Sequence, residues 1–305
     1  MFVPPTFEGV TSVAVIEEII QDTVDLEVIY SPTLDFRDYH KFRDTEINLI
    51  LGLPYRGYEL PADFSITVDN PFTDFLHFST YGEGIRGVHI TSIVEPNKDP
   101  IKELSHVLEY SPDTTILSKH ATLTDKSRQL VEAINAYRTW TWESNGTTRL
   151  LLALYHASYK RLPKLLRGVS LPDVVKQNAP VIKGQMEKLE DYLERKRDMV
   201  KTFHVTIDGS PCILKTVYAE EYVNELANDI LMREVGSTPV IVCVGRTTRS
   251  NDIFSIRTKG IHAGRVAQLI NNGSGKDEVA TVFAGLSYAE LMGTGIQNKL
   301  AQIQE

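Results

Sequence analysis

Short apolar runs and longer stretches with helical spacing alternate along the first part of the chain. Residues 1–5, 26–30, 47–51 and 75–78 form apolar runs that predict strands. Between the first two runs, apolar side chains recur every three or four residues, which predicts a helix. Strands that alternate with helices favour a parallel sheet with both faces covered.

The middle of the chain has mainly helical spacing. Helices are predicted over residues 101–110, 124–143, 149–159 and 163–167. Pro172 and Pro180 are expected to interrupt this pattern, because proline lacks the N–H that a helix interior needs. From Val181 to about Phe203, an apolar stripe runs beside alternating acidic and basic residues, which is typical of a solvated connector helix.

The last third of the chain returns to strand-like patterns. Strands are predicted over residues 203–207, 212–217, 239–244, 253–258 and 279–283. A helix is predicted over 220–232, and a short second helix precedes a glycine-rich turn. The patterns together predict an α/β protein: an N-terminal parallel-sheet domain over residues 1–178, a connector helix over 179–203, and a smaller C-terminal α/β domain with a mixed sheet over 204–305.

Composition narrows the class of protein. The 305 residues carry a net charge of −8, which argues against non-specific nucleic-acid binding over the whole surface. No apolar run reaches about 18 residues, and no basic segment precedes an apolar core, so we expect a cytoplasmic protein without a membrane partner. Cys212 and Cys243 lie in apolar runs, which indicates buried side chains packed in the core rather than a disulfide.

One stretch near the C-terminus has the chemistry of an anion site. Gly273 and Gly275 bracket a turn in which backbone N–H groups can converge, and Ser274 and Lys276 complete it. Arg257, on the preceding strand, and Arg265 can supply guanidinium groups that match phosphate geometry. The simpler interpretation is a structural turn with surface arginines.

Several segments together resemble one family. They are residues 136–143, 193–200, 222–228, 255–258 and 273–276. The chain resembles, best over residues 135–287, the DHH phosphoesterase superfamily with its DHH-associated C-terminal domain, especially the oligoribonuclease (nanoRNase) branch. Ser255-Ile256-Arg257-Thr258 is similar to the family's phosphate-contacting strand, and Lys276 stands where the family carries histidine in Gly-Gly-Gly-His.

The resemblance implies a metal-dependent chemistry that this chain does not match. Such enzymes use two divalent ions, usually manganese, held by clustered carboxylates and imidazoles. The family's metal-ligand positions fall on Pro4, Thr6, Glu8, Gly52, Ser79, Thr80, Tyr81 and Arg138. Of these only Glu8 is a carboxylate, and Arg138 would repel a dication. The resemblance therefore implies that the metal positions have lost their ligands. It also implies that Arg257, Arg265 and residues 273–276 bind a ligand.

Two acidic clusters offer replacement metal ligands. They contain Asp35, Asp38, His40, Asp69, Asp74 and His77. The first cluster precedes the third predicted strand, at a different place in the order from the family's motif, and a solvated loop is the simpler explanation.

These observations leave three alternative hypotheses about function. In the first, the chain is a catalytically degenerate relative that binds a nucleotide, cyclic dinucleotide or short oligonucleotide in a retained interdomain cleft, without a cofactor. In the second, it is an active manganese-dependent phosphodiesterase that uses the relocated ligands. In the third, it is a protein-interaction module whose cleft is filled by an ion pair between Glu8 and Arg138. A homodimer is compatible with each, because the family often dimerises.

Overall fold

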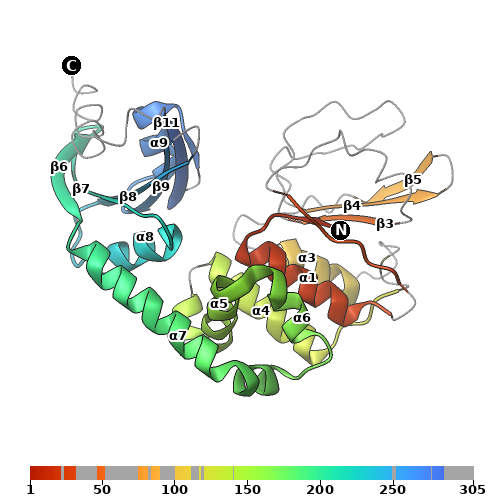
Figure 1. Cartoon of the computed structure of the whole chain (residues 1–305). Helices are drawn as coiled ribbons and strands as arrows, with labels where there is room; N and C mark the ends of the chain where they lie inside the picture. Colours follow the sequence, from red (N-terminus) through yellow and green to blue (C-terminus); the bar gives the residue numbers. More distant parts are fainter. Residues whose placement is uncertain are drawn as a thin grey trace. The chain divides into compact units, whose positions relative to one another are not determined.

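In the computed structural model, the chain divides into two compact units, Met1–Met186 and Glu187–Glu305 (Figure 1). This boundary falls inside the predicted connector, 179–203. The structure describes residues 1–21, 24–31, 47–51, 75–81, 84–89, 100–110, 117, 120–139, 141–248, 252–275 and 277–284. Within these ranges, no helix combines the length and the hydrophobicity that crossing a membrane requires.

The N-terminal unit contains a five-stranded sheet in the order β2-β1-β3-β4-β5. The strands are β1 (Phe2–Val3), β2 (Ile29–Tyr30), β3 (Ile47–Leu51), β4 (Phe75–Tyr81) and β5 (Gly84–His89). β1 pairs in parallel with both β2 and β3, as predicted, whereas β3–β4 and β4–β5 are antiparallel. The α/β class is thus confirmed, and β5 is a strand that the hydrophobic pattern did not predict.

The helices of this unit form one apolar core around α1. They are α1 (Phe7–Ile19), α3 (Pro100–Tyr110), α4 (Asp125–Arg138), η4 (Trp142–Ser144), α5 (Gly146–Ser158), η5 (Tyr159–Arg161), α6 (Leu162–Leu166) and the first part of α7 (Leu171–Arg197). α1 begins where the Thr6 side chain accepts a hydrogen bond from the Gly9 N–H, 3.3 Å away. Ten of its thirteen residues are buried, so this helix is covered on nearly every side.

Two helix boundaries differ from the prediction. α4 ends at Arg138 rather than near Glu143, because the Thr139 hydroxyl and N–H both bond to the Asn135 carbonyl and close the last turn. α7 does not stop at its prolines. Pro172 occupies an early helix position where its missing N–H has no cost, and Pro180 lies inside the helix. The helix then ends at Arg197, because β6 begins at Lys201.

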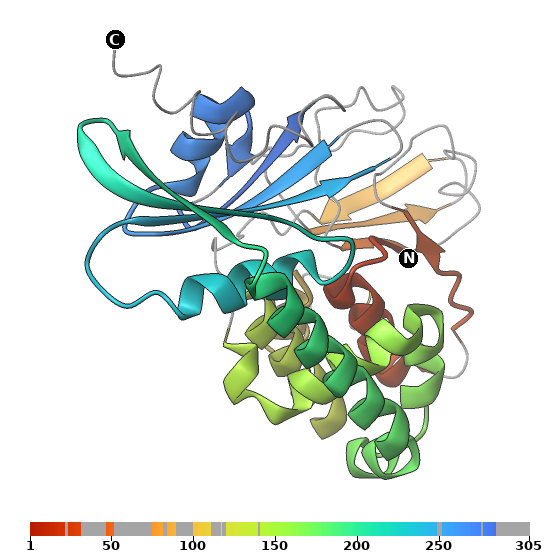
Figure 2. The same ribbon diagram turned by 60° about the vertical axis from the view of Figure 1, so that its left-hand side comes forward.

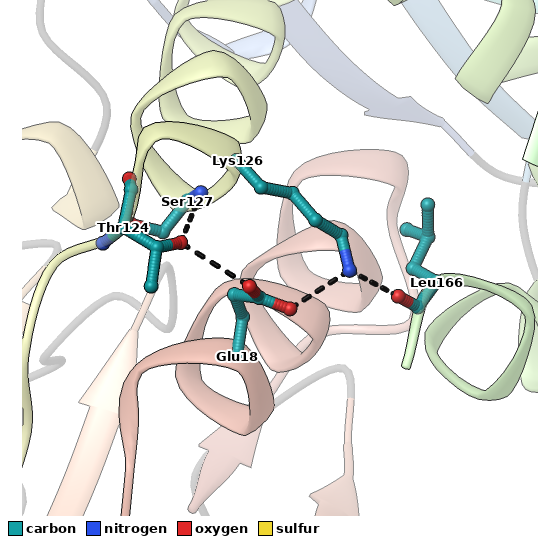
Figure 3. A network of polar contacts seen from close by, with 5 residues as sticks. All are labelled: Glu18, Thr124, Lys126, Ser127 and Leu166. Atoms are coloured by element: carbon teal, nitrogen blue, oxygen red, sulfur yellow. Dashed lines mark hydrogen bonds and ion pairs between the residues drawn. The ribbon is translucent and has the colours of Figure 1, made fainter. Parts of the chain in front are cut away.

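A polar network joins three helices of the N-terminal unit (Figure 3). The Lys126 ammonium donates to a carboxylate oxygen of Glu18, 2.8 Å away, and to the carbonyl of Leu166 at the end of α6. The Thr124 hydroxyl donates to the other Glu18 oxygen at 3.2 Å, and Thr124 also caps α4 with Ser127. Lys126 therefore links α1 and α6 to the start of α4.

The half-buried carboxyl of Glu17 makes the stability of this unit depend on pH. Burial raises its pKa above the ordinary value, against the attraction of Arg167 and Lys164. A raised pKa in the folded state stabilises the protein at low pH, and this stabilisation is lost as the pH rises through that pKa.

We therefore expect the difference in melting temperature between Glu17→Gln and wild type to be more positive at neutral pH than near pH 4. Thermal melts at both pH values would measure this difference. Glu190→Gln, at an exposed position on α7, is the matched control. A difference between variant and wild type that is more negative at neutral pH than near pH 4 would contradict the prediction.

The C-terminal unit is a six-stranded mixed sheet in the order β10-β11-β9-β8-β7-β6. Its elements are β6 (Lys201–Ile207), β7 (Ser210–Tyr218), α8 (Val223–Met232), β8 (Val240–Thr247), β9 (Asp252–Lys259), α9 (Ala263–Asn271), β10 (Ser274–Gly275) and β11 (Val279–Ala284). Only β7 and β8 pair in parallel among these described strands, so the predicted mixed sheet is confirmed. Asp208 and Gly209 both have positive φ and make the tight β6–β7 hairpin turn.

Helices α8 and α9 cover opposite faces of this sheet (Figure 2). On β8, Ile241 and Cys243 pack in the cluster that contains α9, whereas Val240, Val242 and Val244 pack with α8. Both cysteines are free and buried, as expected, and burial raises the pKa of the Cys243 thiol to about 12. The alternation along β8 decides which side chains of the neighbouring β9 face each helix.

Candidate functional site

Arg257 lies on β9 with its side chain on the α8 face of the sheet. Its neighbour Ile256 packs in the cluster on the α9 face, so strand alternation directs Arg257 the other way. The Arg257 guanidinium donates to the Asn224 side-chain oxygen on α8 at 3.3 Å, and the residue is 6% exposed. A buried guanidinium held by a helix is positioned before any ligand arrives.

The turn between β10 and β11 lies beside the end of β9. The Thr258 N–H donates to the Glu278 carbonyl at 3.0 Å, and the Thr258 hydroxyl donates to the Asp277 carbonyl at 3.2 Å. Gly275 pairs with Ala280 across the β10–β11 hairpin. Thr258 therefore contacts Asp277 and Glu278, which follow the predicted glycine turn, and β11 lies between β9 and the Ser274–Gly275 strand of that turn; Lys276 itself lies outside the described residues.

The glycines of this region allow unusually close packing. A Cβ on Gly275 would lie 2.3 Å from the Ala280 Cβ, and one on Gly273 would lie 2.6 Å from a Val282 methyl group. Gly264, on α9, has a similar role, because its Cβ would lie 2.7 Å from the Gly275 carbonyl oxygen. Packing alone therefore accounts for glycine at Gly273 and Gly275, whatever else the turn does.

His262 fixes this turn and was not predicted as a functional residue. Its Nδ1 accepts a hydrogen bond from the Arg265 N–H at 3.1 Å and so caps α9. Its Nε2 lies 3.1 Å from a carboxylate oxygen of Asp277, and the Asp277 carbonyl accepts from the Ala263 N–H at 2.7 Å. Histidine is not among the residues that usually cap a helix, so the sequence carried no ordinary signal for this cap.

Arg265 does not join Arg257. Its guanidinium lies 3.4 Å from a carboxylate oxygen of Asp208, at the β6–β7 turn. α9, which carries Arg265, covers the face of the sheet opposite to the one on which Arg257 lies. The two arginines predicted to bind one ligand are thus placed on different faces. The glycine turn packs against α9 through Gly264, and the pairing of β9 with β11 connects it to the strand that carries Arg257.

In the N-terminal unit, three of the predicted metal-ligand positions come from touching elements. The rings of Phe7 and Tyr137 have centroids 4.9 Å apart, which joins the start of α1 to the end of α4. Thr6 and Glu8 flank the first ring in sequence, and Arg138 follows the second. The Thr6 side chain is engaged in capping α1. A Glu8–Arg138 ion pair remains a prediction.

The other predicted positions are separated by strand direction. Leu51, which precedes Gly52, is paired with Phe75 at the start of β4, whereas Ser79 is paired with Ile47 at the other end of β3. Four residues along a strand span roughly 13 Å. Ser79, Thr80 and Tyr81 therefore lie at the opposite end of β3 from its junction with Gly52, and Gly52 itself lies outside the described residues.

The two clusters that could supply replacement metal ligands lie almost wholly outside the residues that the structure describes. Asp35, Asp38, His40, Asp69 and Asp74 fall outside the ranges of the structure, and His77 is described only as part of the β4 backbone. Across the described ranges, no group of three or more His, Cys, Asp and Glu residues could hold a metal ion.

Comparisons by sequence find no relative: no protein-family model matches the chain, and no curated protein matches it significantly. Solved structures do match. A DHH-domain protein described as a member of a family of ribosomal proteins superposes with a TM-score of 0.59 at 9% identity, covering 99% of this chain and 86% of that one.

Two more distant matches cover the chain equally well. They are a pGpG-specific phosphodiesterase, PggH, from Vibrio cholerae (TM-score 0.43, 10% identity, 98% of both chains) and the exonuclease RecJ bound to manganese (0.46, 12%, 100% of this chain and 91% of that one). At these TM-scores neither bears on the assignment, which depends on the DHH-domain protein. The chain has the fold of this DHH-domain protein.

Proposed function

We propose that the chain binds a nucleotide, a cyclic dinucleotide or a short oligonucleotide through Arg257 and the turn 273–276, and that it does not hydrolyse it. The observation that carries this proposal is the position of Arg257. Its guanidinium is buried and held by Asn224, and the next residue, Thr258, bonds to the carbonyls of Asp277 and Glu278, directly after the glycine turn. A preorganised guanidinium suits a phosphate group, and we propose that backbone N–H groups of the turn complete the site.

The residues at the predicted metal positions do not suit two manganese ions. Manganese prefers carboxylate, carbonyl and imidazole ligands. The positions instead carry proline, threonine, glycine, serine, tyrosine and arginine, with Glu8 as the single carboxylate. We therefore derive no hydrolytic step from this set, and we propose that the chain is a cytoplasmic binding protein related to an enzyme.

Thermal melting with a ligand panel tests the proposal. The panel contains mononucleotides, linear dinucleotides and cyclic dinucleotides, each with manganese or with a chelator. We expect one class to raise the melting temperature equally in both conditions, since a ligand at a hundred times its Kd stabilises by about 2.7 kcal/mol.

Two outcomes would contradict the proposal. A rise that requires manganese, together with hydrolysis of the ligand, would indicate an active phosphodiesterase with relocated ligands. No rise with any nucleotide would favour a protein-interaction module.

A further inference from the structure

Residues 144–172 form a basic segment in an acidic protein. They contain Arg149, Lys160, Arg161, Lys164 and Arg167 but no aspartate or glutamate, although the whole chain has 40 acidic residues and a net charge of −8. This segment makes up α5, η5, α6 and the approach to α7. It belongs to the N-terminal unit and does not include any residue of the Arg257 site.

Four of these cations are exposed within eight consecutive residues. They are Lys160 and Arg161 in η5, Lys164 in α6, and Arg167 directly after α6. The opposite face of α6 is buried through Leu162, Pro163 and Leu166. We call the four cations the α6 basic face.

No described residue forms an ion pair with any member of the α6 basic face. Glu17 is close enough to Lys164 and Arg167 to be influenced by their charge, but elsewhere in this unit cations such as Lys126 and Lys102 have carboxylate partners at 2.8 and 3.0 Å. Exposed cations that are not held in an ion pair are available to an external anion.

Aromatic rings lie beside the basic face. The Lys160 ammonium is 5.8 Å from the centroid of the Tyr159 ring, and Tyr30 contacts that ring edge-on, with centroids 6.0 Å apart. Tyr159 is partly exposed. Single-stranded nucleic acids bind where cations follow the phosphates and aromatic rings offer a surface for stacking bases.

A hollow of about 420 Å³ begins where α6 ends. It is lined by Glu18, Lys126, Gln129 and residues 168–172. Lys126, which lines the hollow, bonds to the carbonyl of Leu166 (Figure 3), and Leu166 directly precedes Arg167. The hollow therefore adjoins the end of the basic face. Its walls combine a carboxylate, an ammonium, an amide and a hydroxyl with the apolar surfaces of Val169, Leu171 and Pro172, and sites of this size accept small organic groups.

We propose that the α6 basic face binds the phosphates of a single-stranded nucleic acid and that the adjoining hollow takes one of its bases. A membrane surface is the less suitable partner, because the large exposed apolar side chains of the described residues all lie elsewhere: Tyr110, Val181, Met199, Met232, Val235 and Phe283. This proposal goes beyond binding at Arg257 and does not depend on it.

Fluorescence anisotropy of a labelled single-stranded octanucleotide with the full chain tests the proposal. We expect Lys160→Gln/Lys164→Gln to weaken binding about tenfold at low salt and to reduce the slope of log affinity against log salt by about 1.4, since each single-strand phosphate contact contributes about 0.7. The matched control is Lys176→Gln/Lys201→Gln, which removes two exposed cations elsewhere. It should leave both quantities unchanged.

A second variant tests the hollow. Gln129→Trp fills it without removing a charge, so binding should weaken while the salt slope stays the same. Equal effects of the two lysine pairs, no effect of either, or wild-type binding to anionic vesicles but not to the octanucleotide would overturn the proposal.

Arg257→Ala separates this site from the proposed function. Loss of the mononucleotide melting shift in Arg257→Ala, with the α6-dependent octanucleotide binding intact, would show two independent sites.

Discussion

Arg257→Ala abolishes the nucleotide-induced rise in melting temperature if the proposed function is correct. The guanidinium is a buried cation on β9, the strand that pairs with β11 directly after the glycine turn. Its loss would remove the bidentate phosphate contact that we propose for it, which a backbone N–H group cannot replace. At a ligand concentration of a hundred times the Kd, the whole stabilisation of about 2.7 kcal/mol should disappear.

Matched variants separate binding from folding. Arg265→Ala removes an exposed guanidinium that pairs with Asp208, and it should leave the shift intact, because Arg265 lies on the other face of the sheet. Arg257→Lys should keep part of the shift, since charge remains while the planar fork is lost. Melting without ligand reports whether each variant is folded. A full ligand-induced shift in folded Arg257→Ala would exclude Arg257 from the binding site. Equal losses of the shift in both alanine variants would indicate that Arg265 also belongs to the site.

Gly9→Ala destabilises the N-terminal unit even though alanine is the better helix former. A Cβ at this position would lie 2.2 Å from the Pro4 carbonyl oxygen and 2.9 Å from the Pro4 Cδ, and the backbone oxygen cannot move aside cheaply. The cost of overpacking, about 3 kcal/mol, exceeds the gain in helix propensity of about 1 kcal/mol, so we expect a net loss of about 2 kcal/mol. Because α1 is buried by the other helices, the loss affects the core of the unit.

Gly184→Ala is the control, with an effect of opposite sign. Gly184 lies within α7, and no atom would come within 4 Å of its Cβ, so alanine should stabilise by about 0.5–1 kcal/mol. Both tryptophans, Trp140 and Trp142, belong to the N-terminal unit, and their fluorescence during urea unfolding reports on this unit. Equal stability of Gly9→Ala and wild type would refute the steric argument.

Most of the fold could be predicted from local pattern. The apolar run of β8 and the apolar alternation of β9 indicated strands, and the periodicity of apolar residues indicated α1, α4 and α8. The predictions were wrong where contacts with distant parts of the chain determine the local structure. Pro180 reads as an interruption, yet α7 continues through it because one missing N–H costs about 3 kcal/mol, which packing of a long helix can offset.

The candidate site was predictable in its chemistry but not in its arrangement. Arginine on a strand before a glycine turn indicated an anion site, and the structure pairs the strand of Arg257 with the strand that follows the turn. Nothing in the spacing of Arg257 and Arg265 shows that they lie on opposite faces. Similarly, His262 is an isolated histidine in the sequence, and its bonds to the Arg265 N–H and Asp277 require the fold.

The sequence by itself determined which chemistry is available: a single carboxylate among the family's metal positions, arginines and glycines near the C-terminus, and a segment from 144 to 172 without acids. Only the tertiary structure decided which of these groups can act together. The antiparallel register of β3 and β4 separates Ser79 from the Gly52 end, and the two faces of the C-terminal sheet separate Arg257 from Arg265. The physical reason is that side-chain identity is local, whereas strand direction and sheet face depend on pairing between segments that are distant in sequence.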